Sequence, residues 1–80
     1  MTWAYRMLRV NAHLPYVIII EVYATDGVID SWTDTPVYAV GDNVADLKED
    51  MALMALALEK PLLEEVGGKL VEVSDENNGA

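Results

Sequence analysis

Residues 16–24 form an almost continuous apolar run that contains three consecutive isoleucines and is interrupted by Glu21. A run of this length, rich in β-branched residues, predicts a central strand that is apolar on both faces. Asp26-Gly27 follows, and this pair is the strongest short signal for a two-residue hairpin turn because glycine takes positive φ at no steric cost. We therefore expect residues 28–33 to return as an antiparallel strand.

Residues 4–10 precede this hairpin and predict a further strand, with Pro15 in the loop between them because proline cannot donate a ladder hydrogen bond. Gly41 is expected to close the β region. Near the other end, Gly67-Gly68 indicates a flexible joint, and residues 69–73 are a candidate for a short edge strand.

Residues 44–59 predict an amphipathic helix. Asn43 is a plausible N-cap, with Asp46 in the reciprocal capping position three residues later. Pro61 ends the helix because it excludes the α conformation in the residue before it. Apolar residues recur at three- and four-residue spacing along one stripe, which we expect to pack on the sheet: Val44, Leu47, Met51, Met54, Ala55 and Leu58.

These elements predict an α+β domain with two layers in the order β-β-β-α. Its antiparallel sheet would have three or four strands, with the amphipathic helix packed on one face. The domain is expected to span residues 1–66. Residues 67–80 are expected to form a flexible tail that includes the candidate edge strand, with the polar residues 74–80 disordered.

The charge and the cysteine count exclude several function classes. The 80 residues carry 5 Lys and Arg against 14 Asp and Glu, a net charge of −9, with no cysteine and one histidine. Such an acidic chain repels a phosphate backbone, so we expect no direct binding of nucleic acid. Disulfides and thiolate zinc sites are excluded, and no apolar run is long enough to span a membrane. We expect a cytoplasmic protein without membrane contact, and its small size favours self-association as a source of stability.

No constellation of residues predicts catalysis. His13 is the one candidate proton shuttle, and it lies in a predicted loop. Asp26, Asp30 and Asp34 recur every four residues, but that spacing spans about 13 Å along a strand and does not bring the carboxylates to one ion. We therefore expect a non-enzymatic protein with no catalytic, cofactor-binding or metal-binding residues.

Two leucines of the predicted helix are candidates for an interaction surface. Leu53 and Leu56 fall off the apolar stripe and form a second apolar strip. One alternative is that the C-terminal segment, through residues 62–63 or 70–71, folds over them. The other is that they form a homodimer contact.

Acidic and aromatic side chains supply the other candidates. Asp46, Glu49 and Asp50 crowd the first turns of the helix, where they either stabilise its positive end or form a docking surface for a basic protein. Trp32 and Tyr23 are among the rings that either fill the core or make an open sheet face suited to interactions.

Several stretches of the chain resemble a family of small bacterial proteins of about this length that has no assigned activity. The resemblance covers residues 3 to about 65 and supports the domain boundaries. It rests on Trp3-Ala4-Tyr5-Arg6, Glu21-Val22-Tyr23, Asp26-Gly27, Ser31-Trp32-Thr33, Pro36-Val37, Gly41 and Leu58-Glu59-Lys60-Pro61-Leu62.

The stretch Gly41-Asp42-Asn43, followed by the acidic start of the helix, also resembles the N-terminal domain of HicB-type antitoxins. That resemblance implies the same order of hairpin, third strand and helix, and contact with a small basic toxin ribonuclease. We expect no counterpart of that family's DNA-binding segment after Pro61.

The sequence thus favours a protein–protein interaction module that homodimerises, through an open sheet face or through Leu53 and Leu56. The alternative is a HicB-antitoxin-like regulator that binds a small basic partner protein through its acidic helix.

Overall fold

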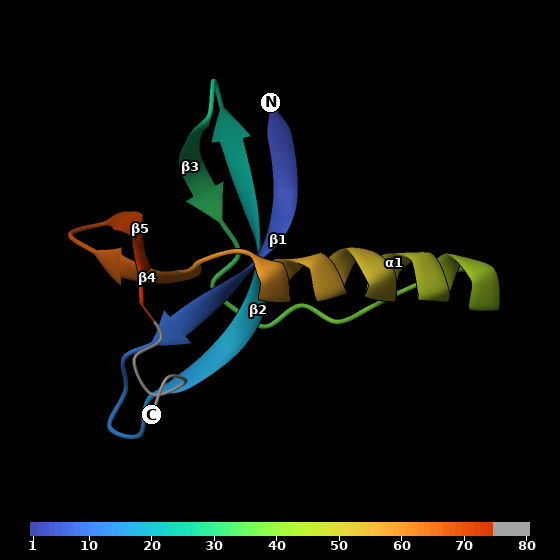
Figure 1. Cartoon of the computed structure of the whole chain (residues 1–80), viewed down its shortest axis with the longest axis horizontal. Coiled ribbons are helices and arrows are strands. Elements are labelled where there is room, and N and C mark those ends of the chain that lie inside the picture. The colour runs from blue at the N-terminus through green and yellow to red at the C-terminus, as the bar shows by residue number, and fades with distance from the viewer. Residues whose placement is uncertain (75–80) are drawn as a thin grey trace.

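The computed structural model describes residues 1–74 and shows a mixed α+β fold with one α-helix and a five-stranded sheet (Figure 1). The predicted α+β class is confirmed. The disorder was predicted for residues 74–80, and all of these except Ser74 lie outside the described residues. The elements are β1 (Thr2–Val10), β2 (Tyr16–Thr25), β3 (Val28–Trp32), α1 (Val44–Leu56), a 3₁₀ turn η1 (Ala57–Glu59), β4 (Leu62–Val66) and β5 (Lys69–Val73).

The sheet has the order β3-β2-β1-β4-β5, so the expectation of three or four antiparallel strands is wrong in number and in one pairing. β1 and β4 run parallel, with Leu8 beside Leu63, while the other neighbours are antiparallel. β4 and β5 form a hairpin whose turn is Gly67-Gly68, with φ of 60° and 80°. The pair that indicated a flexible joint is therefore a two-residue turn, because both glycines adopt the positive φ that such turns require.

The predicted hairpin at Asp26-Gly27 is confirmed. Asp26 has φ 53° and Gly27 φ 80°, and they join β2 to β3. The register is irregular between Tyr23 and Ala24, and beyond this bulge Trp32 pairs with Val22. The bulge thus decides which face of the sheet Trp32 occupies.

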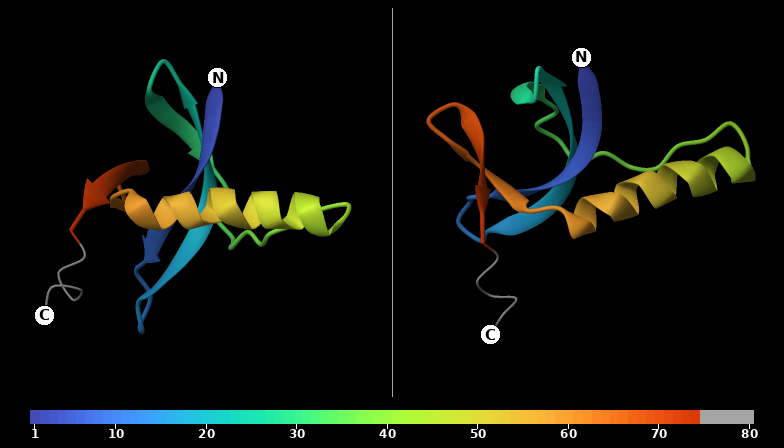
Figure 2. Two further views of the ribbon diagram at one scale, coloured as in Figure 1. Left: turned by 45° about the vertical axis from the view of Figure 1, so that its right-hand side comes forward. Right: turned by 45° about the horizontal axis from the view of Figure 1, so that its top comes forward.

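The main core lies inside the curve of the sheet. Leu8, Ile20, Val22 and Leu63 form its buried cluster, and Ile29, Trp32 and Leu70 are among the partly buried side chains packed around them. The two edge strands β3 and β5 come into contact across this concave face. Figure 2 shows the strands bending round it. The sheet therefore encloses most of its apolar side chains by curling.

The helix does not cover the sheet as expected. None of the thirteen residues of α1 is buried, and Figure 1 shows its N-terminal half extending past the strands. Its C-terminal end is anchored at the convex face of the sheet, where Ala57 of η1 is fully buried and the Tyr5 hydroxyl donates to Asp50 Oδ1 over 2.6 Å. Because the curled sheet encloses the core by itself, the apolar side chains of the helix are not needed to cover that core.

The connection from β3 to α1 runs back along β2 and then along the helix. Thr33 N–H donates to the Glu21 carbonyl and Val37 N–H to the Ile19 carbonyl, each over 3.0 Å. Val40 N–H donates to Asp50 Oδ2 over 2.9 Å. These bonds tie the projecting helix to the sheet through the connecting segment.

The helix begins at the predicted cap. Asn43 has an extended backbone, and its side-chain oxygen accepts from Asp46 N–H over 2.9 Å. In return, the Asp46 carboxylate accepts from the Asn43 side-chain amide over 3.4 Å. The predicted pairing of these two residues is confirmed.

We predict that Gly41→Ala destabilises the protein. A methyl group at Gly41 would lie 2.7 Å from the Asp46 carbonyl carbon and 2.8 Å from Leu47 Cα, against backbone that cannot give way easily. Overpacking of this kind costs about 1–3 kcal/mol. Chemical denaturation should show a loss in this range, while Asp42→Ala, at the exposed neighbouring position, changes the free energy of unfolding much less. Equal stability of the two variants would contradict the close packing at Gly41.

Candidate functional site

The first candidate surface is a groove between α1 and the start of β1. Its volume is about 180 Å³, and its walls are Trp3, Tyr5, Leu53, Leu56 and Lys60, with Ala4 between the two rings. The rings of Trp3 and Tyr5 meet edge to face, with centroids 5.2 Å apart. The structure thus places Leu53 and Leu56 together, as predicted, and sets them against β1.

The second candidate surface is the apolar stripe, along α1 and η1, that we expected to pack on the sheet. Val44, Met51 and Leu58 are 67 %, 57 % and 63 % exposed. They recur every seventh residue, and Leu47 and Met54 stand between them at the spacing of a coiled-coil seam. We call these five residues the helix stripe. The stripe could be recognised in the sequence, but its exposure to solvent could not be predicted from it.

The acidic residues of the helix are largely engaged within the chain. Asp46 exchanges hydrogen bonds with Asn43. Asp50 accepts from both the Tyr5 hydroxyl and Val40 N–H. Glu49 is exposed. Of the three acidic residues predicted to form a docking surface, Glu49 is the one whose side chain makes no hydrogen bond or ion pair with residues 1–74.

The bond between Tyr5 and Asp50 changes the acidity of both groups. The hydrogen bond to Asp50 is the main cause that raises the pKa of Tyr5 to about 12, and burial adds to it. The same bond, followed by that from Val40 N–H, lowers the pKa of Asp50. The pair is therefore most stable with the carboxylate ionised and the phenol neutral.

Tyr23 and Trp32 do not share a surface. Tyr23 and Val22 are adjacent on β2, so their side chains point to opposite faces of the sheet, and Trp32 is paired with Val22. Tyr23 lies beside Trp3 in the register and donates to Glu21 Oε1 over 2.9 Å, a bond that raises the pKa of the tyrosine.

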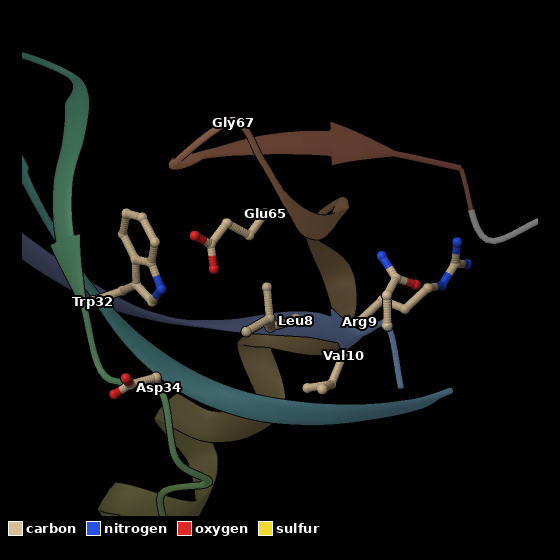
Figure 3. A pocket seen from close by; sticks show the side chains of 8 residues that line it. Leu8, Arg9, Val10, Trp32, Asp34, Glu65 and Gly67 are labelled. Carbon is tan, nitrogen blue, oxygen red and sulfur yellow. The ribbon is translucent and has the colours of Figure 1, made fainter. Parts of the chain in front are cut away.

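Trp32 lines a third surface, a pocket of about 380 Å³ in the concave face of the sheet. Leu8 and Val10 of β1 form its apolar floor (Figure 3). Asp34, just past β3, and Glu65 of β4 flank the indole, and Arg9 lies at the other end. The sequence singled out Trp32 but not Glu65, because nothing in it indicated that β4 folds beside β1 and brings Glu65 opposite β3.

The one histidine of the chain is not among the residues of the three surfaces. His13 is exposed in the loop between β1 and β2. Within residues 1–74, no three His, Asp or Glu side chains gather closely enough to hold a metal ion. In the same part of the chain, no helix is long and apolar enough to cross a membrane.

Comparison with known proteins found no matching family model, no matching curated protein and no matching solved structure. The resemblances to the small bacterial family and to the HicB-type antitoxins therefore stay predictions.

We predict that Tyr5→Phe raises the pKa of Asp50 toward its ordinary value, because the phenol that stabilises the carboxylate is gone. The carboxyl carbon shift of Asp50, followed by NMR across the acid range, measures this change. Tyr16→Phe, at an exposed tyrosine, should leave it unaltered. An unchanged Asp50 titration in Tyr5→Phe would contradict the hydrogen bond.

The same bond predicts how stability depends on pH. The Asp50 pKa is lower in the folded protein, so its contribution is present above the unfolded pKa and is lost as pH falls through the folded value. The Tyr5 pKa is higher in the folded protein, so its contribution is present below about 10 and is lost as pH rises through about 12. Tyr5→Phe should therefore lose less stability on acidification than the natural chain.

Proposed function

We propose that this protein is a small, cytoplasmic, non-enzymatic interaction module that self-associates through the helix stripe. One observation carries the proposal: Val44 and Met51 of α1 and Leu58 of the following turn η1 stand largely exposed at seven-residue spacing, and the N-terminal half of α1 extends beyond its own sheet. Apolar side chains that are exposed singly are common, but a continuous row of them marks an interaction surface.

A second copy of the same chain fits this row. Two helices with apolar side chains alternating at three- and four-residue spacing pack with the knobs of one in the holes of the other. In a two-fold dimer every contact occurs twice, so one short stripe serves both subunits. Complete burial of such a side chain contributes about 1.5–3 kcal/mol, and the exposed fractions of Val44, Met51 and Leu58 leave roughly 1–2 kcal/mol of this for each of them on dimerisation. Leu47, at 36 % exposed, and the half-buried Met54 have less left to gain.

The charge distribution of the helix is compatible with a close approach of two copies. Each chain carries a net charge of −9, which by itself opposes association. On a helical wheel, however, Asp50, Asp46 and Glu49 lie roughly 80°, 120° and 180° round the helix from the centre of the stripe. Pairing through the stripe therefore keeps these carboxylates away from those of the second copy, and added salt would screen the remaining repulsion.

A basic protein partner is the second candidate, as the likeness to HicB-type antitoxins implies. The exposed carboxylate of Glu49 and the exposed Asp46, on the side of α1 away from the stripe, support it. Binding through these residues would weaken with salt and with Glu49→Lys, and it would survive loss of the dimer.

We predict that Met51→Glu converts the protein to a monomer, because two buried carboxylates would meet at the centre of the paired helices. The solution mass should be measured by light scattering over a concentration series, at low and high salt. The natural chain should be dimeric at micromolar concentration in both salts. Ala52→Glu adds the same charge one residue along, on the outer side of the helix, and should remain dimeric.

Two outcomes would overturn the stripe as the interface. A natural chain that is monomeric throughout the series would show that the stripe does not bind a second copy. A dimer that survives Met51→Glu but is lost in Leu56→Glu would move the interface to the groove beside Trp3. Circular dichroism of each variant must match the natural chain, so that loss of the dimer is not loss of the fold.

A further inference from the structure

The concave pocket differs in chemistry from the convex surface that carries the helix. Leu8 and Val10 supply an apolar floor, and the partly buried indole of Trp32 forms one wall. At about 380 Å³ the pocket is within the range of sites that hold small ligands or single side chains. A second hollow adjoins it and shares Trp32, Asp34 and Glu65 with it, so these three residues stand between two accessible spaces.

The two carboxylates beside Trp32 have no partner among residues 1–74. The side chains of Asp34 and Glu65 make no hydrogen bond or ion pair within this part of the chain. Other acids of the sheet are engaged: Glu64 faces Arg9 over 3.6 Å and Glu72 faces Arg6 over 3.5 Å. The negative charge available to a ligand is therefore concentrated at the Trp32 end of the pocket.

A cation fits this combination better than a neutral or an anionic group. A positive charge is attracted to the face of an indole ring, most strongly of all aromatic side chains. Glu65 reaches from β4 toward the ring, and Asp34 lies below the ring, just past the end of β3 (Figure 3). A group held against the indole would therefore meet the Glu65 carboxylate, and the Asp34 carboxylate at the lower edge of the pocket adds negative charge. Arg9, the cation of the pocket, lies at the opposite end and does not occupy this position.

The geometry points to a binding site for the positively charged side chain of a partner protein, with arginine favoured over lysine. A guanidinium is planar, stacks on an aromatic face and donates to carboxylates in a fork, whereas an ammonium is a compact and strongly hydrated point charge. The acidic character of the whole chain, with its net charge of −9, would draw a basic partner toward this face. This inference is independent of the proposed dimer, because the pocket lies on the concave face and the stripe on the projecting helix.

The test uses the tripeptide Gly-Arg-Gly amide as the probe and its citrulline counterpart as a neutral control of the same shape. The chain has two tryptophans, so an NMR spectrum of the ¹⁵N-labelled protein contains two indole N–H signals, which Trp3→Phe assigns. The arginine peptide should shift the Trp32 signal saturably and leave that of Trp3 in place. The citrulline peptide should bind at least about two- to fivefold more weakly, because it lacks the cation–π contact.

Charge-neutral variants locate the site. Glu65→Gln and Asp34→Asn should each weaken binding of the arginine peptide by about two- to fivefold. Asp26→Asn removes the same charge in the hairpin turn, where asparagine tolerates the positive φ, and should leave the affinity unchanged. The monomeric Met51→Glu variant should bind the peptide as the natural chain does, which separates this site from the dimer interface.

Three results would overturn the inference. The first is no saturable shift of the Trp32 signal, and the second is equal binding of the arginine and citrulline peptides. The third is an equal loss of affinity in Asp26→Asn and Glu65→Gln, which would show attraction to the net charge and not to the pocket. A lysine peptide that binds more tightly than the arginine peptide would refute the preference for a planar cation.

Discussion

The parallel pairing of β1 with β4 is the interaction on which the rest of this structure depends. It sets Leu63 beside Leu8 and so adds the β4–β5 hairpin to the edge of the β1–β2 hairpin. With five strands the sheet is wide enough to curl until β3 and β5 touch. Leu8, Ile20, Val22 and Leu63 are then enclosed without a second layer. A small domain can bury little apolar surface. Because the curled sheet encloses this core by itself, the helix does not have to cover a face of the sheet.

Both interaction surfaces follow from this arrangement. The helix is fixed to the convex face through Tyr5, Asp50 and Ala57, which leaves the helix stripe free along its projecting part. The same curl of the sheet brings Glu65 of β4 near Trp32, at the end of β3, although the two residues are far apart in the sequence. The stripe is apolar, whereas the pocket carries carboxylates with no partner among residues 1–74, so the two surfaces suit partners of different chemistry.

The parts of the fold that local chemistry controls could be predicted from the sequence. The Asp26-Gly27 turn, the Asn43 cap and the strands of residues 2–32 depend on neighbouring residues, and the structure confirms them. Gly67-Gly68 has the composition of a flexible joint and of a hairpin turn alike, and the pairing of β4 with β1 decides between them. A parallel pair has no local turn signal, because its strands are joined through a long connection.

The same reason explains why the candidate sites were only partly predicted. An apolar stripe on a helix predicts that these side chains will be buried. It does not indicate whether they pack against the chain's own sheet or against a second molecule. Leu53 and Leu56 were singled out for falling off the stripe, and they line a groove with β1 although both stay about half exposed, as Met51 of the stripe does. Glu65 carried no local signal, because its role depends on where β4 joins the sheet.

The separation of the two surfaces gives a dimer a property that a single chain lacks. Pairing through the stripe would leave the concave pocket of each subunit open, so a dimer would present two cation-binding pockets held at a fixed distance. A partner with two suitably spaced arginines would engage both pockets, and the second contact would form at a high effective concentration. One weak contact per chain would then suffice for stable and specific binding. The sequence presented self-association and a basic partner bound to the acidic helix as alternatives. If the proposed dimer forms and the pocket binds arginine, self-association and recognition of a basic partner would be successive steps of one function.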